Sequence, residues 1–79
     1  RPRGTISFNV ERPGRVRLGV YDLAGRLVRR LMDEPLVSGT RSVSWSGAGE
    51  RGEVLPWGVY LVRLETPSAT VARKLVLIQ

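Results

Sequence analysis

Apolar and polar residues alternate along most of this chain. Segments 5–10 and 16–20 each place an apolar residue at every second position, and segments 40–45 and 58–65 repeat the pattern. Segment 71–78 is read as the last strand, with a basic pair followed by four aliphatic residues. A period of two puts one apolar face and one polar face on an extended segment, which indicates half-buried β-strands. The predicted core consists of the apolar faces of these strands: Ile6, Phe8, Val16, Leu18, Val20, Val43, Trp45, Tyr60, Val62 and Leu64.

Turn residues separate the alternating segments. Pro13-Gly14, the segment 22–26 and Thr66-Pro67-Ser68 each combine residues that favour tight turns, and Gly25 can take a left-handed conformation. Segment 27–32 fits one helical face as well as a strand, but it is too short for an isolated helix. We expect a strand there that pairs back on Val16–Tyr21. We expect loops over 33–39 and 46–58, so that every proline lies at an end or in a turn.

This organisation predicts six to seven short strands with turn signals every eight to twelve residues. Such spacing is typical of an all-β sandwich rather than of an α/β fold. The 79 residues are enough for one small domain with a single modest core.

Composition then removes several function classes. The chain has no cysteine and no histidine, which excludes disulfides, Cys/His zinc sites and histidine-based catalysis. Seven acidic residues lie mostly in turns, so a facing carboxylate pair is not expected, and the serines lack an activating base. We therefore expect no enzyme activity, no cofactor and no metal.

The charge is strongly basic, at +6, with 13 Lys and Arg residues against 7 acids. An excess of basic residues can indicate a surface that binds nucleic acid. However, the basic residues are scattered from Arg1 to Lys74 without a long block. A solvated, arginine-rich surface is the preferred interpretation, and we expect no nucleic-acid partner. No apolar run is long enough for a transmembrane segment.

A literal G-x-G-x-x-G occurs at Gly47–Gly52. Dinucleotide binding at such a motif needs a following helix whose N-terminal amides hold the phosphates. Pro56 and Gly58 follow closely and prevent a helix, so we interpret the glycines as a structural loop. Trp45, Trp57 and Tyr60 could form an aromatic platform for sugars, but only Trp57 is expected to be exposed.

A family resemblance extends over nearly the whole chain. It rests on Thr5–Val10, Val16–Arg29, Val43–Gly47, Gly58–Leu64 and Arg73–Leu77. In this order the segments resemble the immunoglobulin-like domain of the flagellar hook-capping type, and also the type A C-terminal sorting domain of type IX secretion cargo. Ser46 stands where that family usually has aspartate, and Arg1-Pro2-Arg3 where it has Asn-Pro-Phe.

The resemblance implies an immunoglobulin-like sandwich of seven strands. On its sorting side, it implies a non-enzymatic C-terminal domain, residues 1–79 of a longer secreted bacterial protein. The implied partners are the secretion machinery at the outer membrane, a sortase-like peptidase and the protein's own N-terminal cargo domain. The implied location is secreted or at the cell surface.

The resemblance also points to residues for partner recognition. They belong to its Gly-x-Tyr and basic-pair motifs and to the last aliphatic strand: Gly58, Tyr60, Arg73, Lys74, Leu75, Val76 and Leu77. Two alternatives remain open. One is a structural immunoglobulin-like module beside a catalytic domain, and the other is a carbohydrate-binding sandwich that uses Trp57.

Overall fold

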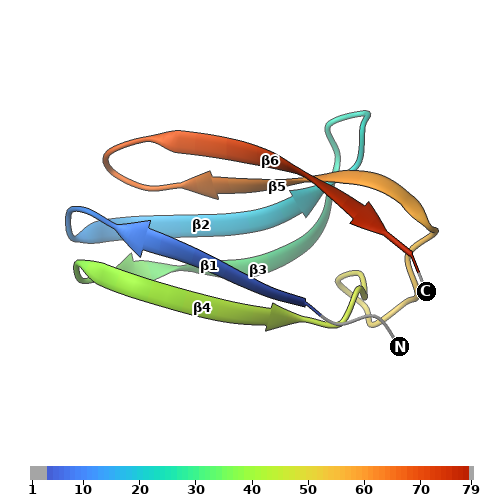
Figure 1. The fold of residues 1–79 in the computed structure, drawn as a ribbon, viewed down its shortest axis with the longest axis horizontal. Helices are drawn as coiled ribbons and strands as arrows, with labels where there is room; N and C mark the ends of the chain where they lie inside the picture. The colour runs from blue at the N-terminus through green and yellow to red at the C-terminus, as the bar shows by residue number, and fades with distance from the viewer. Residues whose placement is uncertain (1–3, 79) are drawn as a thin grey trace.

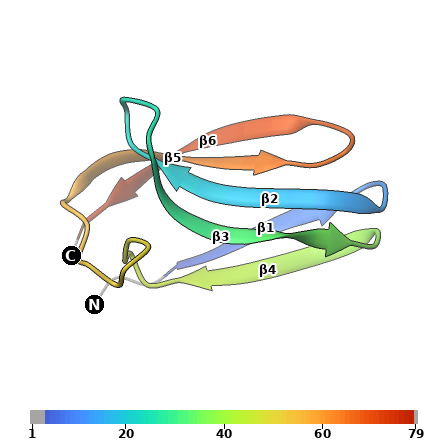
Figure 2. The same cartoon turned by 180° about the vertical axis from the view of Figure 1, so that it is seen from behind.

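The computed structural model describes residues 4–78, which form six antiparallel strands in two sheets (Figures 1 and 2). The strands are β1 (Gly4–Val10), β2 (Gly14–Tyr21), β3 (Leu27–Leu36), β4 (Gly39–Trp45), β5 (Gly58–Glu65) and β6 (Thr70–Leu77). One sheet pairs β1 with β4, and the other has the order β3-β2-β5-β6. The predicted all-β, immunoglobulin-like sandwich is confirmed. The Arg1-Pro2-Arg3 segment lies outside the described residues.

The turns form for the reasons that their residues suggest. The Asp22 carboxylate accepts hydrogen bonds from the backbone N–H of Ala24 at 3.0 Å and of Arg26 at 2.9 Å. Gly25 adopts a φ of 87°, in the left-handed region that favours glycine. This turn brings β3 back along β2, and segment 27–32 is the predicted strand rather than a helix.

The expected loop over 33–39 is wrong, because β3 continues through Pro35 to Leu36. The error came from treating proline as a strand breaker. A proline costs an inner strand a ladder hydrogen bond, but at a sheet edge its nitrogen can face solvent. β3 is an edge strand, and Pro35 lies opposite Arg15 of β2.

The core lies between the two sheets, with one buried cluster at the end where β1 begins and β6 ends (Figure 1). Val16, Leu18 and Val20 of β2 are no more than 1% exposed, because β2 is an inner strand covered by the other sheet. Trp45 and Tyr60 are also buried, as predicted. The other five predicted core residues are half-buried: Ile6, Phe8, Val43, Val62 and Leu64.

Three buried hydrophobic residues were not predicted in the core: Val10, Leu55 and Leu77. Leu55 belongs to the long loop that follows β4, where no periodic pattern marks it. It packs in one cluster with Val20, Trp45, Tyr60 and Leu77. Burying apolar area in this way is the main stabilising contribution in a domain without disulfides.

Candidate functional site

The predicted recognition residues lie on two neighbouring strands. Gly58 and Tyr60 begin β5, and residues 73–77 form most of β6. The antiparallel register sets Tyr60 opposite Leu75 and Gly58 opposite Leu77, so the structure brings these four residues together. β6 is an edge strand, since only β5 pairs with it.

Arg73 and Lys74 do not form one charged patch. Arg73 lies opposite Val62, on the sheet face that carries Tyr60 and Leu75, whereas Lys74 lies opposite Leu61 on the outer face. Successive residues of a strand point to opposite sides, so the two cations are directed away from each other. Both are exposed. A partner would therefore meet them from different sides of β6.

Burial divides the remaining recognition residues. Val76 is 56% exposed, Leu75 is half-buried, and Tyr60 and Leu77 are 6% and 7% exposed. The Tyr60 hydroxyl donates a 2.6 Å hydrogen bond to the carbonyl oxygen of Pro56. Immunoglobulin-like sandwiches use such a tyrosine to fix the chain that enters a strand. Tyr60 thus has a structural role, and the assignment of the group to partner recognition stays a prediction.

The long loop after β4 is a folded element rather than a free glycine-rich segment. Ala48 and Val54 form an isolated β-bridge, and Gly49 donates its backbone N–H to Glu53 at 2.9 Å. The Trp45 indole N–H donates to Ala48 at 2.9 Å. No helix follows Gly52 in the described residues, so the amide end that a dinucleotide motif needs is not formed.

This loop is anchored to β3 by charged residues that the sequence analysis did not single out. Arg29 donates from its guanidinium to the carbonyl oxygen of Gly49 at 3.0 Å. The Glu50 carboxylate accepts the backbone N–H of Arg30, and the Glu50 N–H donates to Val28 at 3.2 Å. These contacts give Glu50 a structural role. Among residues 4–78, no three acidic, cysteine or histidine side chains gather as a metal site would require.

The aromatic platform for sugars is not assembled. Trp57 is 61% exposed, as expected, but Trp45 and Tyr60 are buried in the core. A single exposed indole does not offer the several rings of such a platform. The structure therefore does not support the carbohydrate-binding alternative.

The outer face of the four-stranded sheet carries several ion pairs. Asp33 lies within 3.6 Å of Arg15, Arg17 and Arg30, and Glu65 lies 3.3 Å from Arg63. The Arg63 guanidinium also stands 5.6 Å from the centre of the Tyr21 ring. Exposed pairs of this kind contribute little stability.

Asp22 has the clearest electrostatic perturbation. The backbone N–H of Arg26, with help from the Arg26 guanidinium and the Ala24 N–H, holds the pKa of the Asp22 carboxyl below its ordinary value of 3.8. Because the hydrogen bonds favour the ionised form, this shift belongs to the turn that connects β2 and β3. It does not indicate a catalytic acid.

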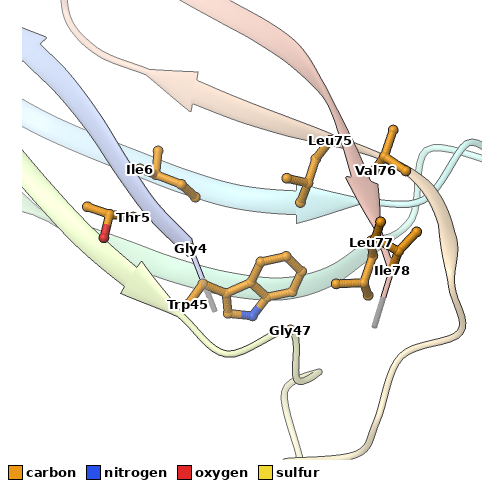
Figure 3. A pocket seen from close by; sticks show the side chains of 9 residues that line it. All are labelled: Gly4, Thr5, Ile6, Trp45, Gly47, Leu75, Val76, Leu77 and Ile78. Carbon is orange, nitrogen blue, oxygen red and sulfur yellow. The ribbon is translucent and has the colours of Figure 1, made fainter. Parts of the chain in front are cut away.

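A groove separates the two sheets at the ends of β1 and β6. It has a volume of about 180 Å³, and it is lined by Gly4, Thr5, Ile6, Trp45, Gly47, Leu75, Val76, Leu77 and Ile78 (Figure 3). Figure 3 shows the Trp45 ring at its floor, with β1 on one side and β6 on the other. Of these residues, the sequence analysis named only 75–77 for recognition. A run without charges at Gly4–Val10 was the available signal for the opposite wall.

Comparison with known proteins places this geometry in a family. A protein-family model of the FlgD Ig-like domain matches residues 2–70. The crystal structure of FlgD from P. aeruginosa is similar, with a TM-score of 0.70 and 25% identity, over 96% of this chain and 61% of that chain. No curated protein matches this chain. Within residues 4–78 there is also no helix of the length and hydropathy that crossing a membrane requires.

These findings support the hook-capping side of the resemblance and overturn its secretion side. The predicted role as a type IX sorting domain is wrong, and so are the predicted partners, namely the secretion machinery, a sortase-like peptidase and a cargo domain. The family is one of structural, scaffold proteins. The chain belongs to the family of the FlgD Ig-like domain.

Proposed function

We propose that this domain is a non-catalytic structural module that contributes to a scaffold of the flagellar hook-capping type. The family match over residues 2–70 carries the proposal. The likeness to FlgD from P. aeruginosa, which this chain covers over 61% of its length, adds the arrangement of the sheets. The activity of the whole protein is therefore part of the proposal.

The charged side chains of the sandwich support a structural role. Asp22, Asp33, Glu50 and Glu65 each bind an arginine or a backbone amide, which fixes turns, strands and the long loop. A catalytic carboxylate would instead need to face a cleft with its oxygens free for substrate. We infer that these acids stabilise the scaffold and that the domain catalyses no reaction.

The exposed part of the edge strand is the surface we assign to partner contacts. Arg73, Lys74 and Val76 are exposed on β6. Gly58 and Tyr60 of the neighbouring strand β5 lie opposite Leu77 and Leu75 and hold β6 in the sheet. An edge strand offers unpaired backbone groups, and flanking cations favour an acidic partner. That residues 1–79 form one domain of a longer protein, and that this protein is secreted or at the cell surface, remain predictions.

A domain exchange tests this function. Residues 1–79 would replace the equivalent immunoglobulin-like domain in FlgD of P. aeruginosa, in a strain that lacks its own copy. We expect hooks, seen by electron microscopy, and swimming motility above the level of a strain whose FlgD has no such domain. The matched control carries Trp45→Ala, which removes a core side chain and should abolish both.

The result that overturns the proposal is a folded exchange protein at normal abundance with no hooks. The double substitution Arg73→Ala and Lys74→Ala, which leaves the core intact, separates the role of β6. If hooks form normally with both cations removed, these two residues are ordinary surface and leave the recognition set.

A further inference from the structure

Two strand edges face each other across the groove without pairing. β1 pairs only with β4, and β6 pairs only with β5, so each has one edge with unpaired backbone donors and acceptors. Figure 1 shows that β1 and β6 run in opposite directions, with the beginning of β1 and the end of β6 at this gap. The gap between β1 and β6 is a place where a further strand would join the two sheets.

The free edges differ in how they are protected. β3 carries Pro35 and several charged residues, and β4 carries Arg41. The first half of β6 carries Arg73 and Lys74. Such residues discourage other strands from pairing with an edge. In contrast, Gly4–Val10 and residues 75–78 contain no charge and no proline. Gly4–Ile6 of the first segment and all of residues 75–78 line the groove.

The groove is shaped for apolar side chains. Ile6 and Leu75 are half-buried at its walls, Trp45 closes its floor, and Ile78 is 62% exposed at its mouth. Its volume of about 180 Å³ is close to the ~150 Å³ at which an apolar cavity elsewhere accepts benzene. Aliphatic side chains of an inserted strand would bury this surface, while its backbone would satisfy the edges of β1 and β6.

We propose that the β1–β6 groove is a strand-acceptor site for an extended segment of a partner polypeptide. The segment alternates apolar and small polar residues, and its apolar side chains lie against Ile6, Trp45 and Leu75. Because β1 and β6 are antiparallel, the segment runs parallel to one of them and antiparallel to the other. The inference rests on the groove itself and holds whichever assembly the domain serves.

Charge specifies the partner further. Arg73 lies on the same face of β6 as Leu75 and Leu77, two and four residues before them, and it is exposed. A strand that covers Leu75 and Leu77 therefore brings one of its residues beside Arg73. An acidic residue fits there, since opposite charges on neighbouring strands attract. A second copy of this chain is a less suitable occupant, because each copy carries a charge of +6. Pairing of two β6 strands would also bring the basic residues Arg73 and Lys74 of both copies close together.

Peptide binding tests the site. The probe is a synthetic peptide of alternating threonine and valine, seven residues long like β1, with glutamate at either its first or its last position. Backbone amide shifts and hydrogen exchange of the domain report where it binds. We expect saturable shifts and slowed exchange at Gly4–Ile6 and residues 75–78. A peptide with a central proline, which lacks a backbone donor, should not bind.

The domain offers a blocking variant and a matched control. Gly4 faces the groove opposite Trp45, and a Cβ built there meets no atom within 4 Å. Gly4→Phe should therefore fill the groove in a folded domain and abolish binding. Asn9→Leu adds an apolar side chain to the outer face of the same strand and should leave binding unchanged. Amide spectra of both variants check that the sandwich is intact.

The last experiment reverses the charge at Arg73. Arg73→Glu should lower the affinity of the domain for the glutamate peptide by up to about fivefold. It should raise the affinity for a peptide with lysine in place of glutamate by a similar factor. Three results would overturn the proposal. They are no binding of either peptide orientation, binding that persists in the folded Gly4→Phe variant, or a dimer of the free domain that Gly4→Phe dissociates in sedimentation. The last would identify a second copy as the occupant.

Discussion

The Tyr60 hydroxyl donates a 2.6 Å hydrogen bond to the carbonyl oxygen of Pro56, four residues earlier. The bond ties the end of the long loop to the beginning of β5. It therefore sets the direction in which the chain enters the sheet. Because β5 lies between β2 and β6, this local contact determines where the edge strand stands.

Tyr60→Phe should destabilise the domain by about 0.5–1.5 kcal/mol, the usual net worth of one hydrogen bond. Pro56 is exposed, so its carbonyl can bind water in the variant, and the loss should fall in the lower part of that range. Urea unfolding followed by tryptophan fluorescence measures it. Tyr21→Phe is the control, since the Tyr21 ring lies on the outer face beneath Arg63 and away from the core. An equal loss in both variants would contradict the assigned role.

Trp45→Ala should cost about 3–5 kcal/mol, because a buried indole is removed and a cavity remains. The same change at Trp57, which is 61% exposed, should stay within about 0.5 kcal/mol. Thermal or urea unfolding of the pair compares two indoles in one chain. A similar loss at both positions would mean that Trp57 packs against the loop more than its exposure indicates.

Local patterns predicted much of the fold, and topology decided what they missed. Alternation located the strands, and the segment after Asp22 was a strand because its turn could form from local hydrogen bonds. Leu55 was missed because a buried loop residue has no periodic partners in sequence. Pro35 was misread because its tolerance depends on β3 being an edge strand, which is a property of the whole sheet.

The candidate site divides in the same way. The last strand was identified from its aliphatic run, and the edge position of β6 gives that run a free side. The opposite wall was not predicted, because Gly4 and Ile6 come next to β6 only after both sheets have formed. Arg73 and Lys74 look like one motif in sequence, yet a strand directs neighbours to opposite faces.

Asp22 predicts a dependence of stability on pH. Its pKa is lowered in the folded state, chiefly by the backbone N–H of Arg26, relative to the ordinary value of 3.8. A carboxyl with a depressed folded pKa contributes stability that is fully present above the unfolded pKa and is lost as pH falls through the folded pKa. Asp22→Asn removes this contribution, since the amide carries no charge.

We therefore expect Asp22→Asn to unfold at a lower urea concentration than the unchanged domain at neutral pH. The difference should stay constant down to about pH 5 and shrink below the ordinary pKa of 3.8, as the carboxyl of the unchanged domain is protonated. Unfolding midpoints across this range measure it. A difference that grows on acidification would show that the turn stabilises the protonated form instead.

Pro35 gives the last prediction, which concerns solubility rather than stability. It lies within β3, whose outer edge is free, and it removes one backbone donor from that edge. Pro35→Thr restores the donor and adds a β-branched residue that favours strands, so the edge becomes a better template for pairing. We expect the variant to remain folded and to self-associate more strongly at high concentration, which sedimentation velocity detects. Glu34→Thr is the neighbouring control, because it alters charge on the same strand without adding a donor. If Pro35→Thr stays monomeric wherever the unchanged domain does, the charged residues of β3 suffice to protect the edge.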